Sequence, residues 1–170
     1  MTSSAVMHGH GRFRYCPNCS NEMTPTEVEG KTLQGCSSCG YIHYLDPKIA
    51  AGVIASNENG EVLLMQRNHE PRKGLWSYPS GYVDSGEKVE DAAVRETLEE
   101  TQVRVKLDGL LGVYSETGNR VVLVVYRGSI VDGEPTAGPE SLAVGFFDPN
   151  ELPELAFPRD GQIIEEWRSG

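Results

Sequence analysis

An acidic stretch over residues 81–103 constrains this chain more than any other part of its sequence. The residues predict a turn at 79–81 and a second turn at 84–86, and from about residue 87 to residue 101 the pattern predicts a helix. Asp84 or Ser85 stands where a side chain would cap the helix N-terminus. We therefore expect a turn followed by a helix that carries many charges.

Three glutamates fall on one face of this expected helix. At 100° per residue, Glu96, Glu99 and Glu100 lie together, whereas Val94 and Leu98 lie on the opposite face. Like charges at this spacing destabilise a helix by about 0.2–0.5 kcal/mol per pair. A hard divalent cation such as Mg²⁺ or Mn²⁺ would reverse that effect, because it takes oxygen ligands and shares phosphate oxygens with a substrate. The helix alone leaves two readings open, a metal site and a solvated acidic face.

The spacing of residues around these glutamates resembles the Nudix box, a loop-helix-loop motif. Gly81 is followed by Glu87, by the pair Arg95-Glu96 and by the pair Glu99-Glu100 at the family's fixed intervals. The resemblance implies an α+β fold, the Nudix αβα sandwich, in which a mixed sheet lies between helices. It covers most of the chain.

Two positions depart from the usual box. Thr97 stands where an aliphatic residue is more common, which is a mild change. Gln102 stands where the family usually has glycine, a residue that ends a helix with positive φ. The second departure puts the end of the helix in doubt and leaves the metal site unaffected.

The resemblance implies a metal-dependent enzyme that hydrolyses a nucleoside diphosphate linked to another group. Water would attack one phosphorus of the diphosphate bridge while Mg²⁺ or Mn²⁺ neutralises charge on the oxygens. By analogy, the metal ligands are the carboxylates of Glu96, Glu99 and Glu100 and the carbonyl of Gly81. Arg95, on a different side of the helix, would pair with Glu87 and fix the carboxylates. The general base is either Glu96 or Glu140, a loop residue beyond the box.

All four cysteines of the chain lie in two CxxC pairs. They are Cys16, Cys19, Cys36 and Cys39. Two such pairs at this separation match the four-thiolate zinc pattern. Disulfides are the alternative, which a chain without a signal peptide disfavours. Few apolar residues lie between the pairs, so metal must supply most of the stability. We expect a zinc ribbon with a structural ion that has no open position for catalysis.

Length and charge indicate one medium domain after this small module. We assign residues 1–12 to a disordered tail in which His8 and His10 are inert, residues 13–46 to the zinc ribbon and residues 47–170 to the Nudix hydrolase domain. No apolar run approaches the ~20 residues of a membrane helix. The N-terminus lacks the apolar core of a secretory signal, so we expect a cytoplasmic location. The formal charge of -10 argues against broad nucleic-acid affinity.

Apolar runs in the larger domain predict strands and a second helix. The predicted strands cover residues 49–56, 61–67, 103–116, 120–130 and 142–147. Asn59-Gly60 predicts a hairpin turn between the first two. The run at 120–130 is apolar enough for a central position in the sheet. Residues 161–168 predict a short helix with Ile163, Ile164 and Trp167 on one side.

Three side chains are candidates for substrate binding. Arg67 follows a strand and either points toward the site, as a phosphate ligand, or lies on the surface. Trp76, in a segment similar to the family's GLW, either packs in the core or stacks on a nucleobase. Tyr78 belongs to the same segment. His43, beside the ribbon, is expected to be structural.

The choice of substrate depends on several short segments. The ribbon, the DPK at residues 46–48, residues 67–87 and residues 138–142 together resemble FAD pyrophosphatases, so FAD cleaved to AMP and FMN is the first expectation. ADP-ribose and NADH are the alternatives, although the SQPWPFP segment of NADH pyrophosphatases is absent and Gly118-Asn119 stand where ADP-ribose hydrolases often have proline.

Another class of function also stays open. The ribbon could read nucleic acid beside an inactive Nudix domain, or it could form a homodimer. The expected partner is nevertheless a small-molecule nucleotide, with neither nucleic acid nor a membrane.

Overall fold

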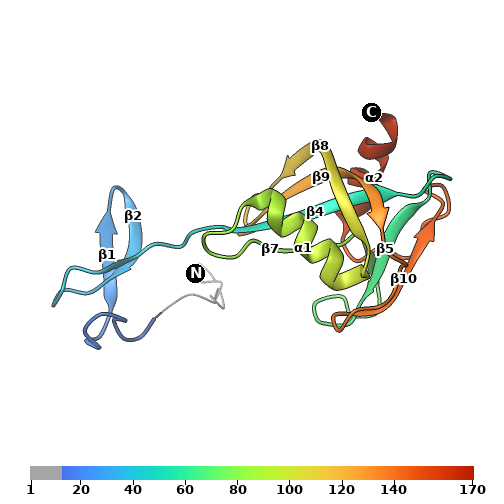
Figure 1. The fold of residues 1–170 in the computed structure, drawn as a ribbon. Coiled ribbons are helices and arrows are strands. Elements are labelled where there is room, and N and C mark those ends of the chain that lie inside the picture. The colour runs from blue at the N-terminus through green and yellow to red at the C-terminus, as the bar shows by residue number, and fades with distance from the viewer. Residues whose placement is uncertain (1–12) are drawn as a thin grey trace. The chain divides into compact units, whose positions relative to one another are not determined.

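The computed structural model describes residues 13–170, and the tail expected over residues 1–12, with His8 and His10, lies outside them. The chain divides into two compact units, Met1–Asp46 and Pro47–Gly170, which we describe separately (Figure 1). No helix of the described chain is long and apolar enough to cross a membrane.

The first unit contains a small antiparallel sheet in the order β1-β2-β3. Its strands are β1 (Thr24–Val28), β2 (Lys31–Gly35) and β3 (Ile42–His43). Glu29 and Gly30 join the first two strands with φ values of 48° and 77°, which is the positive φ that a two-residue hairpin turn requires. The buried core consists of Cys16, Met23 and Cys36. So little burial cannot hold a module together by itself.

The second unit is a mixed seven-stranded sheet with one helix on each side. Its elements are β4 (Lys48–Ser56), β5 (Val62–Arg67), β6 (Trp76–Ser77), β7 (Ser80–Tyr82), α1 (Val89–Thr101), β8 (Arg104–Tyr114), β9 (Val121–Asp132), β10 (Ser141–Phe147) and α2 (Pro158–Ser169). The main path is β10-β5-β4-β9-β8, with β6 beside β5 and β7 beside β4. β4 and β9 are parallel, and the other pairs are antiparallel. The predicted α+β sandwich with a mixed sheet is confirmed.

Alternation along the central strands builds a core on each face of the sheet. In β4, Ile54 packs on the side of α2, together with Ile163 and Ile164 of that helix. Its neighbour Val53 packs on the opposite side, with Ala92 and Ala93 of α1. Both faces are therefore covered, and this explains why the strands read as nearly continuous apolar runs.

The five predicted strands are all present, and the turn at Asn59-Gly60 is confirmed by a φ of 79° at Gly60. The turn predicted at residues 79–81 is wrong, because Ser80–Tyr82 form β7 and pair with β4. Pro79 cannot donate a backbone hydrogen bond and hides this strand from a sequence reading, although its carbonyl accepts from the Val53 amide at 3.1 Å.

The helix boundaries also differ from expectation. α2 begins at Pro158, three residues before the predicted start, because proline at the first helical position fits a helix N-terminus well. α1 begins at Val89 after Lys88, without a side-chain cap, so the expected cap by Asp84 or Ser85 is wrong. The Glu87 carboxylate instead accepts the Asp84 amide at 3.0 Å.

α1 ends where the family's glycine would end it. Gln102 adopts φ 60°, and its amide donates to the Leu98 carbonyl at 2.9 Å. The side-chain nitrogen of Gln102 donates to the carbonyls of Leu98 and Glu99, at 3.2 and 3.3 Å. These bonds offset the strain of a left-handed conformation. Thr97 is fully buried, and its hydroxyl donates to the Ala93 carbonyl at 2.8 Å.

Candidate functional site

The three glutamates of α1 lie at different depths. Glu100 is 2% exposed, the Glu96 side chain 12% and the Glu99 side chain 58%. The apolar face expected at Val94 and Leu98 is not the most buried one, because Ala92 and Ala93 make the contact with the sheet. Small residues let the helix approach the sheet closely, and this approach carries Glu100 inward.

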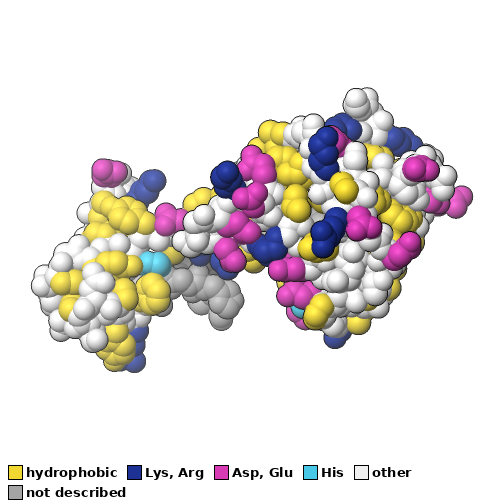
Figure 2. Space-filling model, viewed as in Figure 1, with side chains coloured by type: hydrophobic (Ala, Val, Ile, Leu, Met, Phe, Trp, Pro, Cys, Tyr) yellow, Lys and Arg dark blue, Asp and Glu magenta, His cyan; other side chains and the backbone are white. Residues whose placement is uncertain are grey.

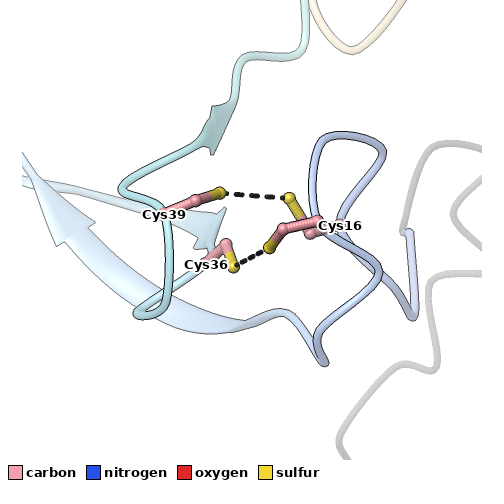
Figure 3. Close-up of side chains that lie close together, drawn as sticks. Cys16, Cys36 and Cys39 are labelled. Carbon is pink, nitrogen blue, oxygen red and sulfur yellow. Dashed lines mark hydrogen bonds between the residues drawn. The ribbon is translucent and has the colours of Figure 1, made fainter.

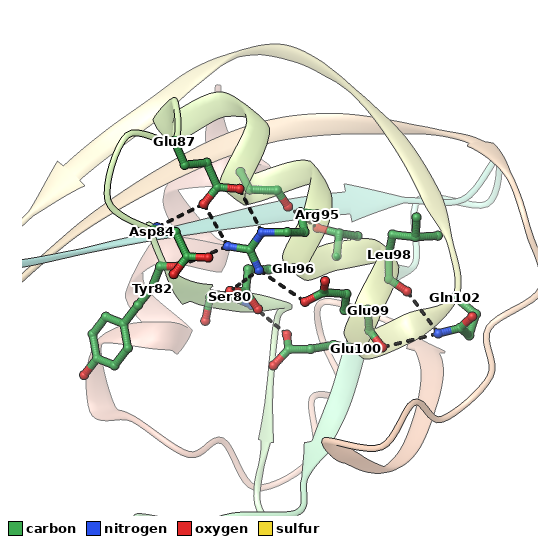
Figure 4. Close-up of polar contacts among 12 residues, drawn as sticks. Ser80, Tyr82, Asp84, Glu87, Arg95, Glu96, Leu98, Glu99, Glu100 and Gln102 are labelled. Carbon is green, nitrogen blue, oxygen red and sulfur yellow. Dashed lines mark hydrogen bonds and ion pairs between the residues drawn. The ribbon is translucent and has the colours of Figure 1, made fainter.

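Glu100 is held against β7. The Ser80 amide donates to its carboxylate at 2.9 Å (Figure 4). Burial raises the pKa of Glu100 to about 8, against the opposing effect of the Ser80 amide, and the neighbouring carboxyls of Glu96 and Glu140 raise it further. An uncompensated buried carboxylate is costly, so this group is suited to binding a cation.

Gly81 lies directly beside Glu96. A Cβ added to Gly81 would overlap the Glu96 carboxyl group. Burial raises the pKa of Glu96, and the hydrogen bond from Arg95 opposes that rise. The glycine of the box therefore leaves room for the Glu96 carboxylate next to the backbone of β7.

Arg95 organises the acidic groups. Its guanidinium donates to Glu87 at 2.8 and 2.9 Å, to Glu96 at 2.7 Å and to Glu99 at 3.2 Å. It also donates to the Tyr82 carbonyl of β7 at 3.2 Å. Hydrogen bonds from Arg95 lower the pKa of Glu87 to about 2. The expected pairing with Glu87 is present, and the long side chain reaches two further glutamates as well (Figure 4).

A loop brings Glu140 to the same place. The Ser141 hydroxyl donates to the Glu100 carbonyl at 2.7 Å, and the Asn68 amide donates to the Glu140 carbonyl at 3.0 Å. A Cβ on Gly138 would run into the Glu99 carbonyl, so the loop can lie this close only with glycine there. Glu140 is exposed and lines the same cavity as the α1 glutamates.

Gly81, Arg95 and the four glutamates Glu96, Glu99, Glu100 and Glu140 line one cavity of about 710 Å³ in the second unit. Arg67, which is 7% exposed, also lines it and donates to the Pro71 carbonyl at 3.1 Å. Tyr78 reaches the cavity from the core and is 1% exposed. Trp76 does not line it, because its ring packs edge-on against Phe147 with centroids 4.7 Å apart. Of the predicted site residues of the second unit, only Trp76 and Glu87 do not line this cavity, and Glu87 contacts it through Arg95.

The sequence reading missed the opposite part of this cavity. Phe157, Pro158, Arg159 and Asp160, at the start of α2, contribute to its lining. A helix predicted to begin only at residue 161 left these positions in a loop. The proline at the first helical position was the one signal that could have moved the start.

A model of the NUDIX domain matches residues 46–167. The chain belongs to the Nudix hydrolase family. It is an enzyme of that class, and its relatives agree with the assignment. It is 39% identical over 137 residues to an ADP-ribose pyrophosphatase of Methanocaldococcus jannaschii, covering 76% of this chain and 80% of that protein.

Two further similarities extend over most of this Nudix hydrolase. The chain is similar to the crystal structure of a NUDIX hydrolase of Nitrosomonas europaea, with a TM-score of 0.85 and 33% identity. The match covers 93% of this chain and 94% of that protein's chain. An NAD-capped RNA hydrolase NudC of Pectobacterium carotovorum is 28% identical over 146 residues. That match spans 85% of this chain but only 55% of NudC.

The carboxylate cluster of this Nudix hydrolase fits a hard divalent cation. Carboxylate oxygens are the donors that Mg²⁺ and Mn²⁺ take. The glutamates of this cluster that line the cavity are Glu96, Glu99, Glu100 and Glu140. Arg95 neutralises only part of their charge, so the remaining negative charge is available to metal ions.

The first unit brings the four cysteine sulfurs together. Cys16 and Cys39 lie 3.5 Å apart, Cys19 and Cys36 lie 3.4 Å apart, and all four sulfurs lie within 4.8 Å of one another (Figure 3). These distances are too long for disulfides, and all four cysteines are free. A tetrahedral zinc ion with sulfur ligands at about 2.3 Å would fit between them.

His43 lies near this cluster as part of β3. Its ring packs edge-on against Phe13, with centroids 4.6 Å apart. Its Nε2 has no hydrogen-bond partner within residues 13–170. The contact agrees with the structural role expected from the sequence.

Proposed function

We propose that this Nudix hydrolase cleaves the diphosphate bridge of an ADP-linked compound and releases AMP. The observation that carries the proposal is the cavity that a buried glutamate, a half-buried one and two exposed ones line together with Gly81. FAD and ADP-ribose are the two compounds to test first, and NADH is the third. All three contain an ADP half.

Different observations support the individual substrates. FAD follows from the ribbon and the sequence segments that resemble FAD pyrophosphatases. ADP-ribose is supported by the relative of Methanocaldococcus jannaschii, which carries that activity in its name. A dinucleotide with a nicotinamide half is supported by the NudC relative, named for NAD-capped RNA.

The residues of the box take the following roles in this proposal. Glu96, Glu99 and Glu100 hold Mg²⁺ or Mn²⁺ with the Gly81 carbonyl. When bound, these ions neutralise charge on the diphosphate oxygens. Arg95 and Glu87 hold the carboxylates in position through the bonds described above.

The attacking water needs a base near the bridge. Glu96 is hydrogen-bonded to Arg95 at 2.7 Å and belongs to the proposed metal site, whereas the Glu140 carboxylate has no hydrogen bond to another described residue. Glu140 is therefore the preferred base and Glu96 the alternative. Arg67, on the cavity wall, would orient a phosphate.

In the first unit, the four cysteines would hold a structural Zn²⁺. With four thiolate ligands the ion has no open position, so it stabilises the ribbon and takes no part in hydrolysis. We assign residues 13–46 to this ribbon and residues 47–170 to the catalytic domain.

A nucleic-acid binding function receives less support. The formal charge is -10. On the face shown in Figure 2, Lys and Arg side chains of the second unit are scattered among Asp and Glu. Nucleic-acid binding relies instead on a continuous basic surface.

The test is chromatographic product analysis with Mg²⁺ or Mn²⁺ and, separately, FAD, ADP-ribose, NADH and an 8-oxo nucleoside triphosphate. We expect AMP from at least one of the ADP-linked compounds. Glu99→Gln and Glu100→Gln should each lower turnover by about two orders of magnitude or more. Cleavage of none of these compounds with either metal would refute the proposed reaction.

A second comparison identifies the base. Glu140→Gln should lower the rate at saturating substrate without weakening metal binding, whereas Glu96→Gln should impair both. Equal rates for wild-type protein and Glu140→Gln would return the role to Glu96.

A further inference from the structure

The cavity contains polar atoms that the proposed hydrolysis does not use. The Tyr78 hydroxyl, Asp160 Oδ2 and the Nε and Nη1 atoms of Arg159 are buried and have no hydrogen-bond partner among the described residues. Tyr78 is 1% exposed and Asp160 2% exposed. All three residues line the cavity that the catalytic glutamates share.

These atoms form one group within the cavity. Burial raises the pKa of Tyr78, and the nearby Asp160 carboxyl raises it further while Arg159 lowers it. Burial likewise raises the pKa of Asp160 to about 7, against the influence of Arg159 and Arg67. The hydroxyl, the carboxyl and the guanidinium are therefore close enough to affect one another, although none is bonded to another.

A buried polar group without a partner is destabilising, and a chain gains stability if apolar residues of similar shape replace it. The buried Tyr78 and Asp160 side chains face one cavity without partners, and this indicates a ligand that supplies them. Phe157 helps to hold the arginines at the wall, because the guanidinium carbons of Arg67 and Arg159 lie 5.2 and 5.9 Å from its ring centroid.

The surroundings of these groups favour a flat ring with a polar edge. Ala50, Val121, Leu123 and Pro158 contribute apolar surface to the same cavity. A sugar would need hydroxyl partners on several sides, and the buried Asp160 carboxyl would repel a phosphate. A nucleobase offers apolar faces together with donors and acceptors along its edge.

The set of donors and acceptors selects among the bases. Asp160 Oδ2 can accept an N–H, whereas the Tyr78 hydroxyl and the Arg159 nitrogens can donate to a ring nitrogen. Adenine presents an N6 amino donor beside the N1 and N7 acceptors. Hypoxanthine has a carbonyl in place of that amino group and would face Asp160 with an acceptor.

We propose that Asp160, Tyr78 and Arg159 form the adenine-binding part of the cavity and set the preference for an ADP-linked substrate. The inference rests on the proposed function for the identity of the base. Asp160 accepts the N6 amino group, and Tyr78 and Arg159 donate to the ring nitrogens.

The test measures binding of nucleotides without hydrolysis. Isothermal titration calorimetry, with no Mg²⁺ or Mn²⁺ added, compares AMP, IMP and ribose 5-phosphate on the full chain. Wild-type protein should bind AMP at least about tenfold more tightly than IMP, because IMP leaves Asp160 facing an acceptor. Ribose 5-phosphate reports the contribution of sugar and phosphate alone.

Two substitutions and one control complete the test. Asp160→Asn should weaken AMP by about tenfold or more and bring IMP to equal or tighter binding, because the new amide can donate to the hypoxanthine carbonyl. Tyr78→Phe removes only a hydroxyl and should weaken AMP by about fivefold to tenfold. Asp132→Asn, at the exposed end of β9 outside this cavity, should change none of the affinities.

Three results would overturn the inference. They are unchanged AMP affinity in both variants, an equal loss for all three ligands, and the absence of measurable AMP binding to wild-type protein. Circular dichroism shows whether each variant is folded. If Asp160→Asn does not fold, the AMP affinity of Tyr78→Phe decides the test. Selective AMP binding without hydrolysis of any ADP-linked compound would refute the proposed reaction alone, and hydrolysis without selectivity would refute this inference alone.

Discussion

Glu100→Gln should lower turnover by about two orders of magnitude or more and yet stabilise the second unit at alkaline pH. In the folded chain, burial raises the pKa of Glu100 from 4.5 to about 8. A carboxyl whose folded pKa is raised contributes stability below its unfolded value, and that stability is lost as the pH rises through the folded value. When the pH rises from 5 to 8, the ionisation of Glu100 should therefore lower the unfolding free energy of the wild-type protein by about 3 kcal/mol.

The substituted amide removes this pH dependence. It keeps an oxygen that can accept the Ser80 amide, and it carries no charge to desolvate. Its own amino group needs a partner, which costs about 1–2 kcal/mol at every pH. We expect Glu100→Gln to be close to wild type or slightly less stable at pH 5, and more stable by about 2 kcal/mol at pH 8.

Urea unfolding followed by tryptophan fluorescence measures the effect, without added Mg²⁺ or Mn²⁺ and without a chelator. Both tryptophans, Trp76 and Trp167, lie in residues 47–170, so the signal reports on this unit. Glu99→Gln is the matched control, because the same change at a 58% exposed side chain should leave stability within about 0.5 kcal/mol. A stability difference between Glu100→Gln and wild type that is the same at both pH values would refute the reasoning.

Three further predictions concern the box and the ribbon. Gly81→Ala forces the Glu96 carboxyl aside and should lower turnover by about a hundredfold with little loss of stability. Gly109→Ala is the control and should change neither turnover nor stability, because an added Cβ there meets nothing within 4 Å. Cys36→Ser, or removal of zinc by a strong chelator, should make residues 13–46 sensitive to proteolysis, and an unchanged digestion pattern would contradict the zinc assignment. Gln102→Gly should raise the unfolding free energy by about 0.5–1 kcal/mol by relieving φ 60°, and a loss of stability would show that the side-chain bonds to α1 matter more.

The fold and the acidic half of the cavity were accessible from sequence because they depend on short-range patterns. The interval between Gly81 and Glu100 predicted the box, and apolar runs predicted the five main strands. The depth of each glutamate was not accessible, because it depends on how closely Ala92 and Ala93 approach the sheet. That approach is a property of packing between distant segments.

The other half of the cavity was missed for a related reason. In the sequence, Asp160 stands in a predicted loop just before the helix expected from residue 161, and nothing there marks it as part of a site. Only the folded chain places it beside Tyr78, from a segment eighty residues earlier, and removes both from water. Sequence patterns cannot reveal polar groups whose partners are missing, because the lack of a partner arises in three dimensions.

Each half of the cavity buries polar groups without compensation, and a different ligand would compensate each half. A cation would compensate the buried Glu100, and an adenine base would supply partners for Asp160 and Tyr78. The Arg67 guanidinium lowers the pKa of both Glu100 and Asp160, although burial has the larger effect on each. A cation bound near Glu100 adds to the positive potential that Arg67 supplies in this cavity, which favours the ionised Asp160 carboxylate that accepts the base. Metal and nucleotide should therefore bind with positive coupling, and by linkage each should raise the affinity of the other by the same factor.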